Sequence, residues 1–275
     1  MDKKQTKGLQ RNTIDKYYTK PAIVLTCIEY IKMKISILEN DIIIEPSAGN
    51  GSFIQHIKSL GKNYKFYDLE PEHNDIEKQD YLQLNNNEIL KSYTNIHIIG
   101  NPPFGRQASL AIKFIKKSCE FCNTLSFILP KSFKKESMKN HFPLHFHLVF
   151  EIDLPEKSFL VNNEEYTVPC IFQIWIKKYY KRLEIEKKDP LNFIIVNKND
   201  NPDISVRRVG VYAGKIDTNL DKSIQSNYFI KFTNDKNIED NIELLKNTHF
   251  QHNNTVGPRS ISKPELIEEF NKFLY

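Results

Sequence analysis

The chain has 275 residues, of which 40% are hydrophobic, and a formal net charge of +5. This length suits one α/β domain with a small appendage, and the apolar content excludes global disorder. No run of about eighteen apolar residues could span a membrane, and the first five residues lack the apolar region of a signal peptide. We therefore expect an intracellular protein of the cytoplasm or nucleus, not secreted and without a membrane partner. The basic balance suits a polyanionic partner.

The predicted elements alternate between strands and helices. Residues 1–12 are polar, and we expect them to be flexible. Residues 21–39 have apolar positions at helical spacing behind Pro21, which suits a first helical turn. From residue 42 onward, short apolar runs alternate with helical patterns, as is typical of a parallel sheet. The predicted strands are 42–45, 65–69, 76–79, 96–100, 125–129, 146–153 and 170–177, and the predicted helices between them are 52–60, 107–121 and 132–140.

The last two predicted strands are joined by a loop, residues 155–168, and not by a helix. This connection predicts a sheet that ends in an antiparallel hairpin, within a Rossmann-like α/β domain over residues 13–180. A charged segment and the pair Asp189-Pro190 then mark a boundary. Residues 190–275 are strand-like and turn-rich, with a closing helix at 263–273, and we expect a small α+β appendage that recognises the substrate.

The cysteine pattern favours a structural role. Four cysteines in a chain of this length give no disulfide framework. Cys119 and Cys122 form a lone CxxC pair with no second pair nearby, so we favour helical spacing on an amphipathic segment over a zinc site. The sequence therefore predicts no metal.

A turn rich in small residues follows the apolar run 42–45 and leads into a helical pattern. Gly49 and Gly51 allow a ligand to approach the backbone where a Cβ would collide, and the free N–H groups of the next helix would face it. A nucleotide-binding turn of the dehydrogenase kind and a plain strand–helix turn are the alternatives, but Gly-x-Gly-x-x-Gly is absent. The candidate ligand-binding residues here are Glu45, Pro46, Ser47, Gly49, Gly51, Ser52 and Phe53.

Two carboxylates lie at the end of the next predicted strand, about twenty residues after this turn, where dinucleotide folds place their acidic residue. Asp68 and Glu70 would point the same way on a strand, so either could accept the ribose hydroxyls of an adenosyl group. We favour Asp68.

The run Asn101-Pro102-Pro103-Phe104 closes the predicted strand 96–100. By itself it would be a loop that ends a strand. In this order after residues 42–53, it resembles motif IV of the S-adenosylmethionine-dependent amino-methyltransferases that methylate adenine N6, and the earlier segment resembles motif I. Segments similar to motifs X, I, II, III, IV, VI and VIII follow one another over residues 13–180, an order similar to that of the gamma class.

The resemblance implies the seven-stranded class I methyltransferase fold and S-adenosylmethionine as the cofactor. A motif X-like segment, residues 15–21, would bring Tyr18 and Thr19 to the methionine end of the cofactor, although Thr19 could also cap the helix that follows. In a motif III-like segment, Asp80 next to Tyr81 would accept from the adenine amino group of the cofactor. An exposed acidic loop is the alternative there. Asn101 would border both cofactor and substrate.

The residues of this run suit methylation of an aromatic amine, whose nitrogen is a poor nucleophile because its lone pair is delocalised. Asn101 supplies a side-chain acceptor, and Pro102, followed by Pro103, supplies a backbone carbonyl in a fixed direction. Phe104 offers a face on which a base can stack. The methyl passes in line from the sulfonium of the cofactor, so catalysis is mostly positioning. A duplex substrate would have to flip its base out.

Further candidate substrate contacts come later in the chain. Lys131 follows the predicted strand 125–129 and is expected to line the target-base pocket. Phe159 either stacks on the flipped base or lies in the core. Arg207, Arg208 and Arg259 stand out in a chain that prefers Lys, and they form either a compact nucleic-acid surface or a solvated face.

We therefore predict a site-specific, adenine-specific DNA methyltransferase that acts on the N6 amine, with DNA ahead of RNA as the nucleic-acid partner. An RNA adenine N6 methyltransferase, for cap-adjacent, ribosomal or spliceosomal adenine, is the alternative, and protein glutamine a more distant one. An inactive cofactor- or nucleic-acid-binding subunit is the non-catalytic alternative, and the need for a partner subunit stays open. Cytosine C5 methylation would use Cys170 after Pro169, but the strand pattern there favours a structural cysteine.

Overall fold

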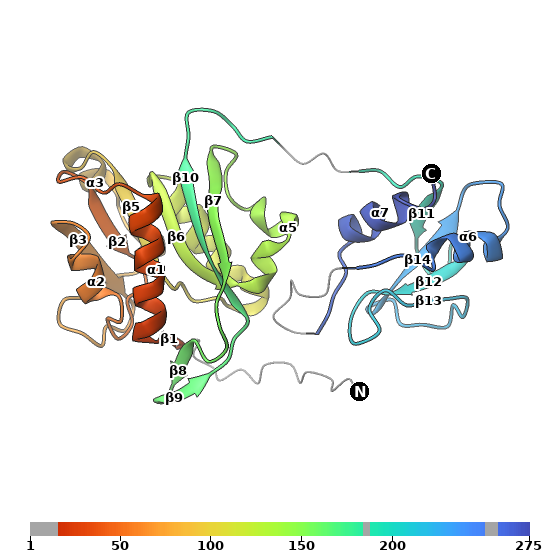
Figure 1. Ribbon diagram of the computed structural model, residues 1–275, viewed down its shortest axis with the longest axis horizontal. Helices are drawn as coiled ribbons and strands as arrows, with labels where there is room; N and C mark the ends of the chain where they lie inside the picture. Colours follow the sequence, from red (N-terminus) through yellow and green to blue (C-terminus); the bar gives the residue numbers. More distant parts are fainter. Residues whose placement is uncertain (1–15, 184–187, 251–257) are drawn as a thin grey trace. The chain divides into compact units, whose positions relative to one another are not determined.

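The chain divides into two compact units near residue 185 (Figure 1). The computed structural model describes residues 16–183, 188–250 and 258–275, and each unit is described by itself. The expected flexible segment 1–12 lies outside the described residues.

The first unit is built on a seven-stranded sheet in the order β4-β3-β2-β5-β6-β10-β7. Strands β4, β3, β2, β5 and β6 run parallel to one another, and β10 runs antiparallel to both β6 and β7. This topology confirms the predicted Rossmann-like class I methyltransferase fold. The strands are β2 (Ile42–Glu45), β3 (Asn63–Asp68), β4 (Glu77–Lys78), β5 (Ile96–Gly100), β6 (Thr124–Pro130), β7 (Phe146–Asp153) and β10 (Cys170–Lys177).

Helices cover this sheet, with α1 packed against β10 and α2, and α4 packed against β6. Ile42 and Ile44 belong to the same core cluster as the apolar side chains of α4. Because side chains alternate along a strand, Ile43 points to the other face, and all three are fully buried. The helices are α1 (Pro21–Lys34), α2 (Ile54–Lys58), α3 (Asn87–Ser92), α4 (Ser109–Cys119) and α5 (Glu136–Lys139), with the short 3-10 helices η1 (Tyr81–Gln83), η2 (Arg106–Ala108) and η3 (Lys131–Lys134).

The predicted helices were longer than those in the structure, and α2, for example, covers only Ile54–Lys58 of the predicted range 52–60. The helix expected over 21–39 ends at Lys34, because Ile35 has an extended backbone. The helix expected over 107–121 begins at Ser109, because Gln107 and Ala108 have positive φ angles. The helix expected over 132–140 is divided into η3 and α5 by Lys135, which is also extended.

The segment 155–168, expected as a loop, contains a β-hairpin. Strands β8 (Phe159–Val161) and β9 (Glu164–Tyr166) pair antiparallel across Asn162-Asn163, whose φ angles are 50° and 65°. Two residues with positive φ are typical of a type I′ hairpin turn. The hairpin also pairs with β1 (Tyr18–Thr19), so the start of the described chain and this hairpin form one small sheet.

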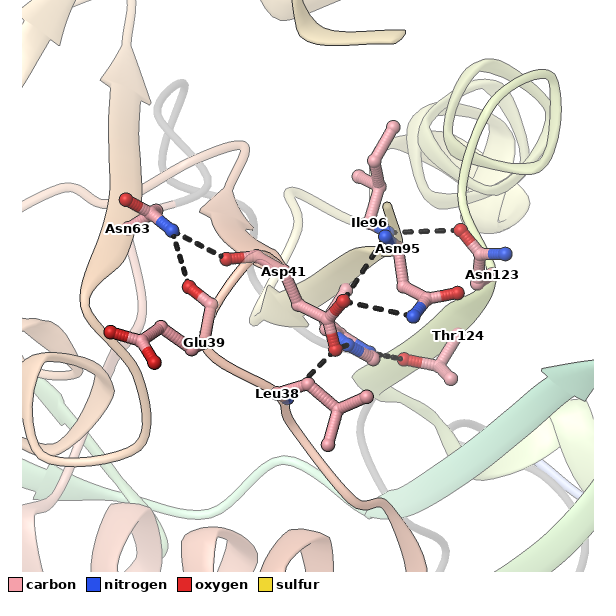
Figure 2. A network of polar contacts seen from close by, with 9 residues as sticks. Leu38, Glu39, Asp41, Asn63, Asn95, Ile96, Asn123 and Thr124 are labelled. Carbon is pink, nitrogen blue, oxygen red and sulfur yellow. Dashed lines mark hydrogen bonds and ion pairs between the residues drawn. The ribbon is translucent and has the colours of Figure 1, made fainter. Parts of the chain in front are cut away.

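A buried polar network joins the loops that precede β2, β5 and β6 (Figure 2). Asp41, before β2, accepts hydrogen bonds from the backbone and side-chain N–H groups of Asn95, before β5. Asn123, before β6, accepts from the N–H of Ile96 at 2.9 Å, and His97 bonds to Asp41 at 3.2 Å. These bonds tie the amino ends of three neighbouring strands together.

The second unit is a small α+β unit, with an antiparallel sheet in the order β11-β14-β12-β13. Two helices pack on it through a core that includes Phe193, Ile230, Leu266 and Phe270. The side chain of Ser262 and that of Glu265 form a capping box at the start of the last helix. The elements are β11 (Phe193–Val196), β12 (Ile204–Arg207), β13 (Ile216–Asp217), β14 (Asn227–Phe232), α6 (Ile238–Leu245) and α7 (Lys263–Asn271).

In the described parts of both units, no helix has the length and apolar character needed to cross a membrane.

Candidate functional site

Three polar residues come together at the carboxyl edge of the central sheet. Strand β2 ends at Glu45, its neighbour β3 ends at Asp68, and β5 on the other side ends just before Asn101. Since the carboxyl ends of parallel strands lie at one edge of a sheet, the topology gathers residues from three separate motifs there. This edge is the default ligand site of open α/β sheets.

The glycine-bearing turn after β2 is tied to the end of β3. The N–H of Ala48 donates to the carbonyl of Tyr67 at 2.9 Å, and the N–H of Gly49 donates to Asp68 Oδ2 at 2.8 Å. Gly49 has a φ of +53°, and a Cβ there would lie 3.1 Å from the ring of Tyr18. Any side chain at position 49 would therefore be strained and would push the Tyr18 ring away.

Asp68 and Glu70 have different positions, although we expected them to share one face of a strand. Strand β3 ends at Asp68, so Glu70 lies beyond it, exposed, with its carboxylate 3.1 Å from Lys16 Nζ. Asp68 Oδ1 accepts from the Glu70 N–H at 2.9 Å, while Oδ2 accepts from Gly49. Each Asp68 oxygen has further acceptor capacity, so Asp68 is the carboxylate that can receive ligand hydroxyls here.

Glu45 is a fully buried acid without a counter-charge. Its Oε2 atom has no hydrogen-bond partner, and burial, followed by the nearby charge of Asp68, raises the pKa of this carboxyl well above its usual value. A Cβ at Gly100 would lie 3.3 Å from Glu45 Cγ, so the glycine gives this side chain its room. Leaving a buried acceptor unsatisfied is costly, and a donor group of a ligand would remove that cost.

Asn101 is oriented by the small N-terminal sheet. Its Nδ2 donates to the backbone carbonyl of Tyr17 at 3.0 Å and to Thr19 Oγ1 at 3.3 Å. A carbonyl can only accept, so the amide nitrogen must face Tyr17, and Oδ1 is fixed on the other side. That oxygen is buried and has no hydrogen-bond partner among the residues that the structure describes. The hydroxyl of Thr19 therefore supports Asn101 and does not cap α1, whose cap residue is Lys20.

The rest of the run from Asn101 to Phe104 is held by α4. The carbonyl of Phe104 accepts from the N–H of Leu110 at 3.1 Å, and the Phe104 side chain is half-buried against the core. Pro102 is buried, and Pro103 is half-buried. Ser47 also contacts this run, since its hydroxyl donates to the Asn101 carbonyl at 3.3 Å.

Aromatic rings of the small sheet lie beside the residues that hold Asn101. Phe159 is fully buried, and its ring packs edge to face on that of Tyr17, with 6.4 Å between the ring centroids. Of the two predictions for Phe159, this packing favours the core. The ring centroid of Tyr17 also lies 5.6 Å from that of Tyr166, and both of these tyrosines are half-buried. We did not single out Tyr17 or Tyr166 from the sequence, but the turn residues Asn162-Asn163 were a signal for the hairpin that carries Tyr166.

The other predicted cofactor residues lie in a helix cap, in the core and in the glycine-bearing turn. Asp80 caps η1, with its Oδ1 accepting from the Leu82 N–H at 2.9 Å. Tyr81 lies in the core, where its hydroxyl bonds to Ser118 Oγ at 2.8 Å. Phe53 is buried and precedes α2. Gly51, Ser52 and Pro46 belong to the turn, in which the N–H of Gly51 donates to Ala48 and both the N–H and the hydroxyl of Ser52 donate to Asn50 Oδ1.

The predicted substrate residues fall in both units. Lys131 Nζ lies 3.4 Å from an Asp153 oxygen, in the first unit. In the second unit, Arg207 Nε donates to the Val209 carbonyl at 2.9 Å, and Arg208 lies over the ring of Tyr228. The carbonyl of Arg259 accepts from the Gly210 N–H at 2.8 Å.

The cysteines are buried in the first unit. Cys170 is enclosed in β10 opposite Pro130, and burial raises the pKa of its thiol well above the usual value. Such a thiol is not the reactive thiolate that cytosine C5 chemistry needs. Cys119 and Cys122 are likewise buried. Within the described ranges, no group of three metal-ligating side chains occurs.

Comparison with known proteins gives one family match and several structural likenesses. A family model described as the EDM2 methyltransferase-like domain matches residues 37–171. Protein ENHANCED DOWNY MILDEW 2 of Arabidopsis thaliana is 26% identical over 169 residues, which cover 58% of this chain and 12% of that protein. The chain thus spans a small part of that relative.

Two solved structures are similar to this chain at low identity. A putative RNA methyltransferase from Pyrococcus horikoshii is 15% identical, with a TM-score of 0.46, over 62% of this chain and 93% of that chain. A modification subunit of a putative type I restriction enzyme from Vibrio vulnificus is 15% identical, with a TM-score of 0.44, over 59% of this chain and 44% of that chain. The sequence match, which includes Glu45, Asp68 and Asn101, supports a methyltransferase-like domain.

Proposed function

We propose that the chain is an S-adenosylmethionine-dependent methyltransferase that methylates the N6 amino group of adenine in DNA. The observation that carries this proposal is the buried, unpartnered Oδ1 of Asn101, at the carboxyl end of β5. The amide that bears it is held by the Tyr17 carbonyl, so the acceptor is ready before a substrate arrives. An amino group, whose N–H groups donate hydrogen bonds, is the ligand that suits this acceptor atom.

The carboxyl edge of the sheet fits the cofactor. Glu45 would receive its ammonium group, because a buried acid without a partner is satisfied by a cationic donor. Asp68 would accept the ribose hydroxyls, with the turn at Gly49 leaving room for close approach. Asp80 would accept from the adenine amino group with the oxygen that does not cap η1. The bound cofactor would supply an activated methyl group on its sulfonium.

The catalytic run would prepare the acceptor amine. Asn101 Oδ1 and the carbonyl of Pro102 would each accept one N–H of the target amine, drawing the nitrogen towards tetrahedral geometry and freeing its lone pair. Proline fixes the backbone direction, so little reorganisation is needed when the base enters. Phe104, half-buried beside them, would stack on the base.

Phe104 favours a planar base as the acceptor, and the net charge of +5 favours a nucleic acid as the substrate. The direct test is transfer of labelled methyl from the cofactor to duplex DNA, single-stranded DNA, total RNA, capped RNA and peptide, followed by mass spectrometry of the product nucleosides. N6-methyladenine in DNA is the expected product. Label in RNA alone would move the function to an RNA adenine methyltransferase, and label in protein alone would overturn the class. Cofactor binding without any transfer would favour a non-catalytic subunit.

The stacking role of Phe104 can be measured separately. Phe104→Ala should raise the KM for the acceptor, because stacking of a base on an aromatic ring contributes about 1–3 kcal/mol. The Kd for S-adenosylhomocysteine, measured by calorimetry, should stay unchanged. An unchanged acceptor KM would reduce Phe104 to a core contact.

A further inference from the structure

A cavity of about 490 Å³ lies in the second unit, between the ends of β11 and β12, β14 and the start of α7. Its lining includes three cationic side chains, Lys198, Arg208 and Lys263, and no carboxylate among the described residues. Lys198 is neutralised by Asp221 at 3.0 Å. Arg208 and Lys263 take part in no ion pair within the described ranges, so two of the three cationic side chains that line the cavity are free to contact an anion.

Arg208 is held rigidly at this cavity. Its guanidinium carbon lies 5.1 Å from the centre of the Tyr228 ring, and the Tyr228 hydroxyl is itself fixed by a hydrogen bond to the Ile261 carbonyl. The backbone of Arg208 bonds to Ser226 and Ile261. Its Nε–H group is nevertheless buried without an acceptor. A preordered guanidinium with an unsatisfied buried donor is suited to an anion with several oxygens.

A neighbouring cavity shows that this arrangement is not general to the unit. That cavity, of about 340 Å³, is lined by Arg207, Lys215 and Lys222, but also by Asp217, whose carboxylate lies 3.1 Å from Lys222. Arg207 Nε already donates to the Val209 carbonyl. Of the two adjacent arginines, Arg208 is therefore the one whose Nε–H group is buried without an acceptor among the described residues, and its cavity is the one of the two without an acidic lining residue.

We propose that the cavity of Lys198, Arg208 and Lys263 binds the phosphate group of a nucleotide. The guanidinium of Arg208 and the ammonium of Lys263 would contact the phosphate oxygens. Ile224, which is 67% exposed, would give an apolar wall for the sugar or base. The volume lies in the range of small-ligand sites, about 300–1,000 Å³. This proposal rests on the proposed function for the source of the nucleotide, a nucleic-acid strand.

The test is binding of a fluorescently labelled oligothymidylate to the full chain, at fixed ionic strength because phosphate contacts depend on salt. This probe has no adenine, so binding does not require an acceptor base. Lys263→Ala and Arg208→Ala should each weaken binding about tenfold, as expected for loss of a charge-assisted hydrogen bond. Lys263 is exposed, so its variant should fold normally. Arg208→Lys keeps a charge and should bind between wild type and Arg208→Ala.

The matched control is Lys272→Ala, which removes a lysine just after the other end of α7, where it pairs with Glu269. It should bind the probe as wild type does. Thymidine 5′-monophosphate should compete with the probe, whereas thymidine should not. Binding of the monophosphate measured directly by calorimetry, without binding of the oligonucleotide, would support the phosphate site and identify a free nucleotide as its ligand.

The proposal is overturned if Lys263→Ala and Arg208→Ala bind the probe as wild type does. Equal loss in Lys272→Ala would also overturn it, since the effect would then be general charge, and so would equal competition by thymidine. Failure here differs from failure of the proposed function. A chain that binds the probe at this cavity but transfers no methyl would support the cavity assignment and contradict the enzyme assignment. A chain that transfers methyl but does not bind the probe at this cavity would support the enzyme assignment and contradict the cavity assignment.

Discussion

Both ends of the central sheet bury an acidic side chain, but they treat it in opposite ways. At the amino end, Asp41 accepts hydrogen bonds from the N–H of Leu38 at 2.8 Å, from two N–H groups of Asn95, and from His97 (Figure 2). At the carboxyl end, Glu45 Oε2 and Asn101 Oδ1 have no partner. Burial is nearly complete for both acids, so the difference lies in their hydrogen-bond partners.

The ionisation of the two acids follows from this difference. Burial tends to raise the pKa of Asp41, but the hydrogen bonds from Leu38, Asn95 and His97 outweigh it and lower the pKa below 3.8. His97 is a base, so burial lowers its pKa below the usual value, and the ring is uncharged at neutral pH. Its Nε2–H donates to Asp41, and Nδ1 accepts from Thr124. A polar cluster whose hydrogen bonds are all made stabilises the fold. Polar atoms without partners at the carboxyl edge of the sheet are available to bind a ligand.

The largest expected effect is at the unsatisfied end. Asn101→Ala should reduce methyl transfer by about 10²–10³-fold, as removal of one preorganised polar group in an active site does. The Kd for S-adenosylhomocysteine should stay close to wild type, because the lost acceptor serves the substrate amine. The free energy of unfolding should fall by about 1 kcal/mol, because the Tyr17 carbonyl and Thr19 lose the hydrogen bonds from the Asn101 amide. Single-turnover transfer, calorimetry and urea unfolding measure the three quantities. Full transfer activity would make the run from Asn101 to Phe104 a structural turn.

The satisfied end should give the opposite result. Asp41→Asn should lower the free energy of unfolding by about 3 kcal/mol, because it replaces one buried carboxylate oxygen by an NH2 group that faces N–H donors. Transfer by the folded fraction should be unchanged. Glu39→Gln is the matched control, since Glu39 is exposed and pairs only with Lys62 at the surface. A wild-type denaturation midpoint for Asp41→Asn would remove the structural role assigned to the network.

Glu45→Gln should separate stability from ligand binding. Cofactor affinity should fall about tenfold, because a charge-assisted hydrogen bond is lost. The free energy of unfolding at neutral pH should not fall, because the variant has no buried acid to ionise. The native pKa of Glu45 lies above 4.5, so wild-type stability should decrease as pH rises from 4.5 towards that pKa, where only the unfolded chain has lost its proton. The variant should lack this decrease. Calorimetry and denaturation at several pH values check both claims, and loss of stability with unchanged affinity would contradict them.

The central strands of the sheet could be predicted from the sequence because they are buried on both faces. Such strands are continuous apolar runs, and the predicted ranges 42–45, 96–100 and 170–177 coincide with β2, β5 and β10. The predicted range 146–153 coincides with β7, an edge strand that is only half-buried. The run that begins at Asn101 was found for the same reason as the central strands, since it directly follows one of them, β5. Helix ends were less predictable, because the extended backbone of Ile35 and Lys135 is set by tertiary packing.

The partners of the site residues could not be predicted, because they come from distant parts of the chain. Asn101 is oriented by Tyr17, and that segment is held by pairing with the hairpin at Phe159. The bond between Asp41 and His97 likewise joins residues 56 positions apart. Local patterns do not contain such pairings. The displacement of Glu70 from the site depends on where β3 ends, and strand boundaries are the least reliable part of a prediction.

The smallest expected effect is at a polar contact that has both partners, as Asp41 does, but is only partly buried. The Tyr18 hydroxyl donates to Glu72, which Lys16 also contacts at 2.9 Å. Burial and this hydrogen bond raise the pKa of Tyr18 to about 12, so the hydroxyl stays a donor at neutral pH. Tyr18→Phe keeps the ring over Gly49, and should lower the free energy of unfolding by less than about 1 kcal/mol, as partly exposed charged contacts do. Cofactor affinity should change little, whereas Tyr18→Ala, which removes the ring, should weaken it further. A tenfold loss of affinity in Tyr18→Phe would instead mean that the hydroxyl itself contacts the cofactor.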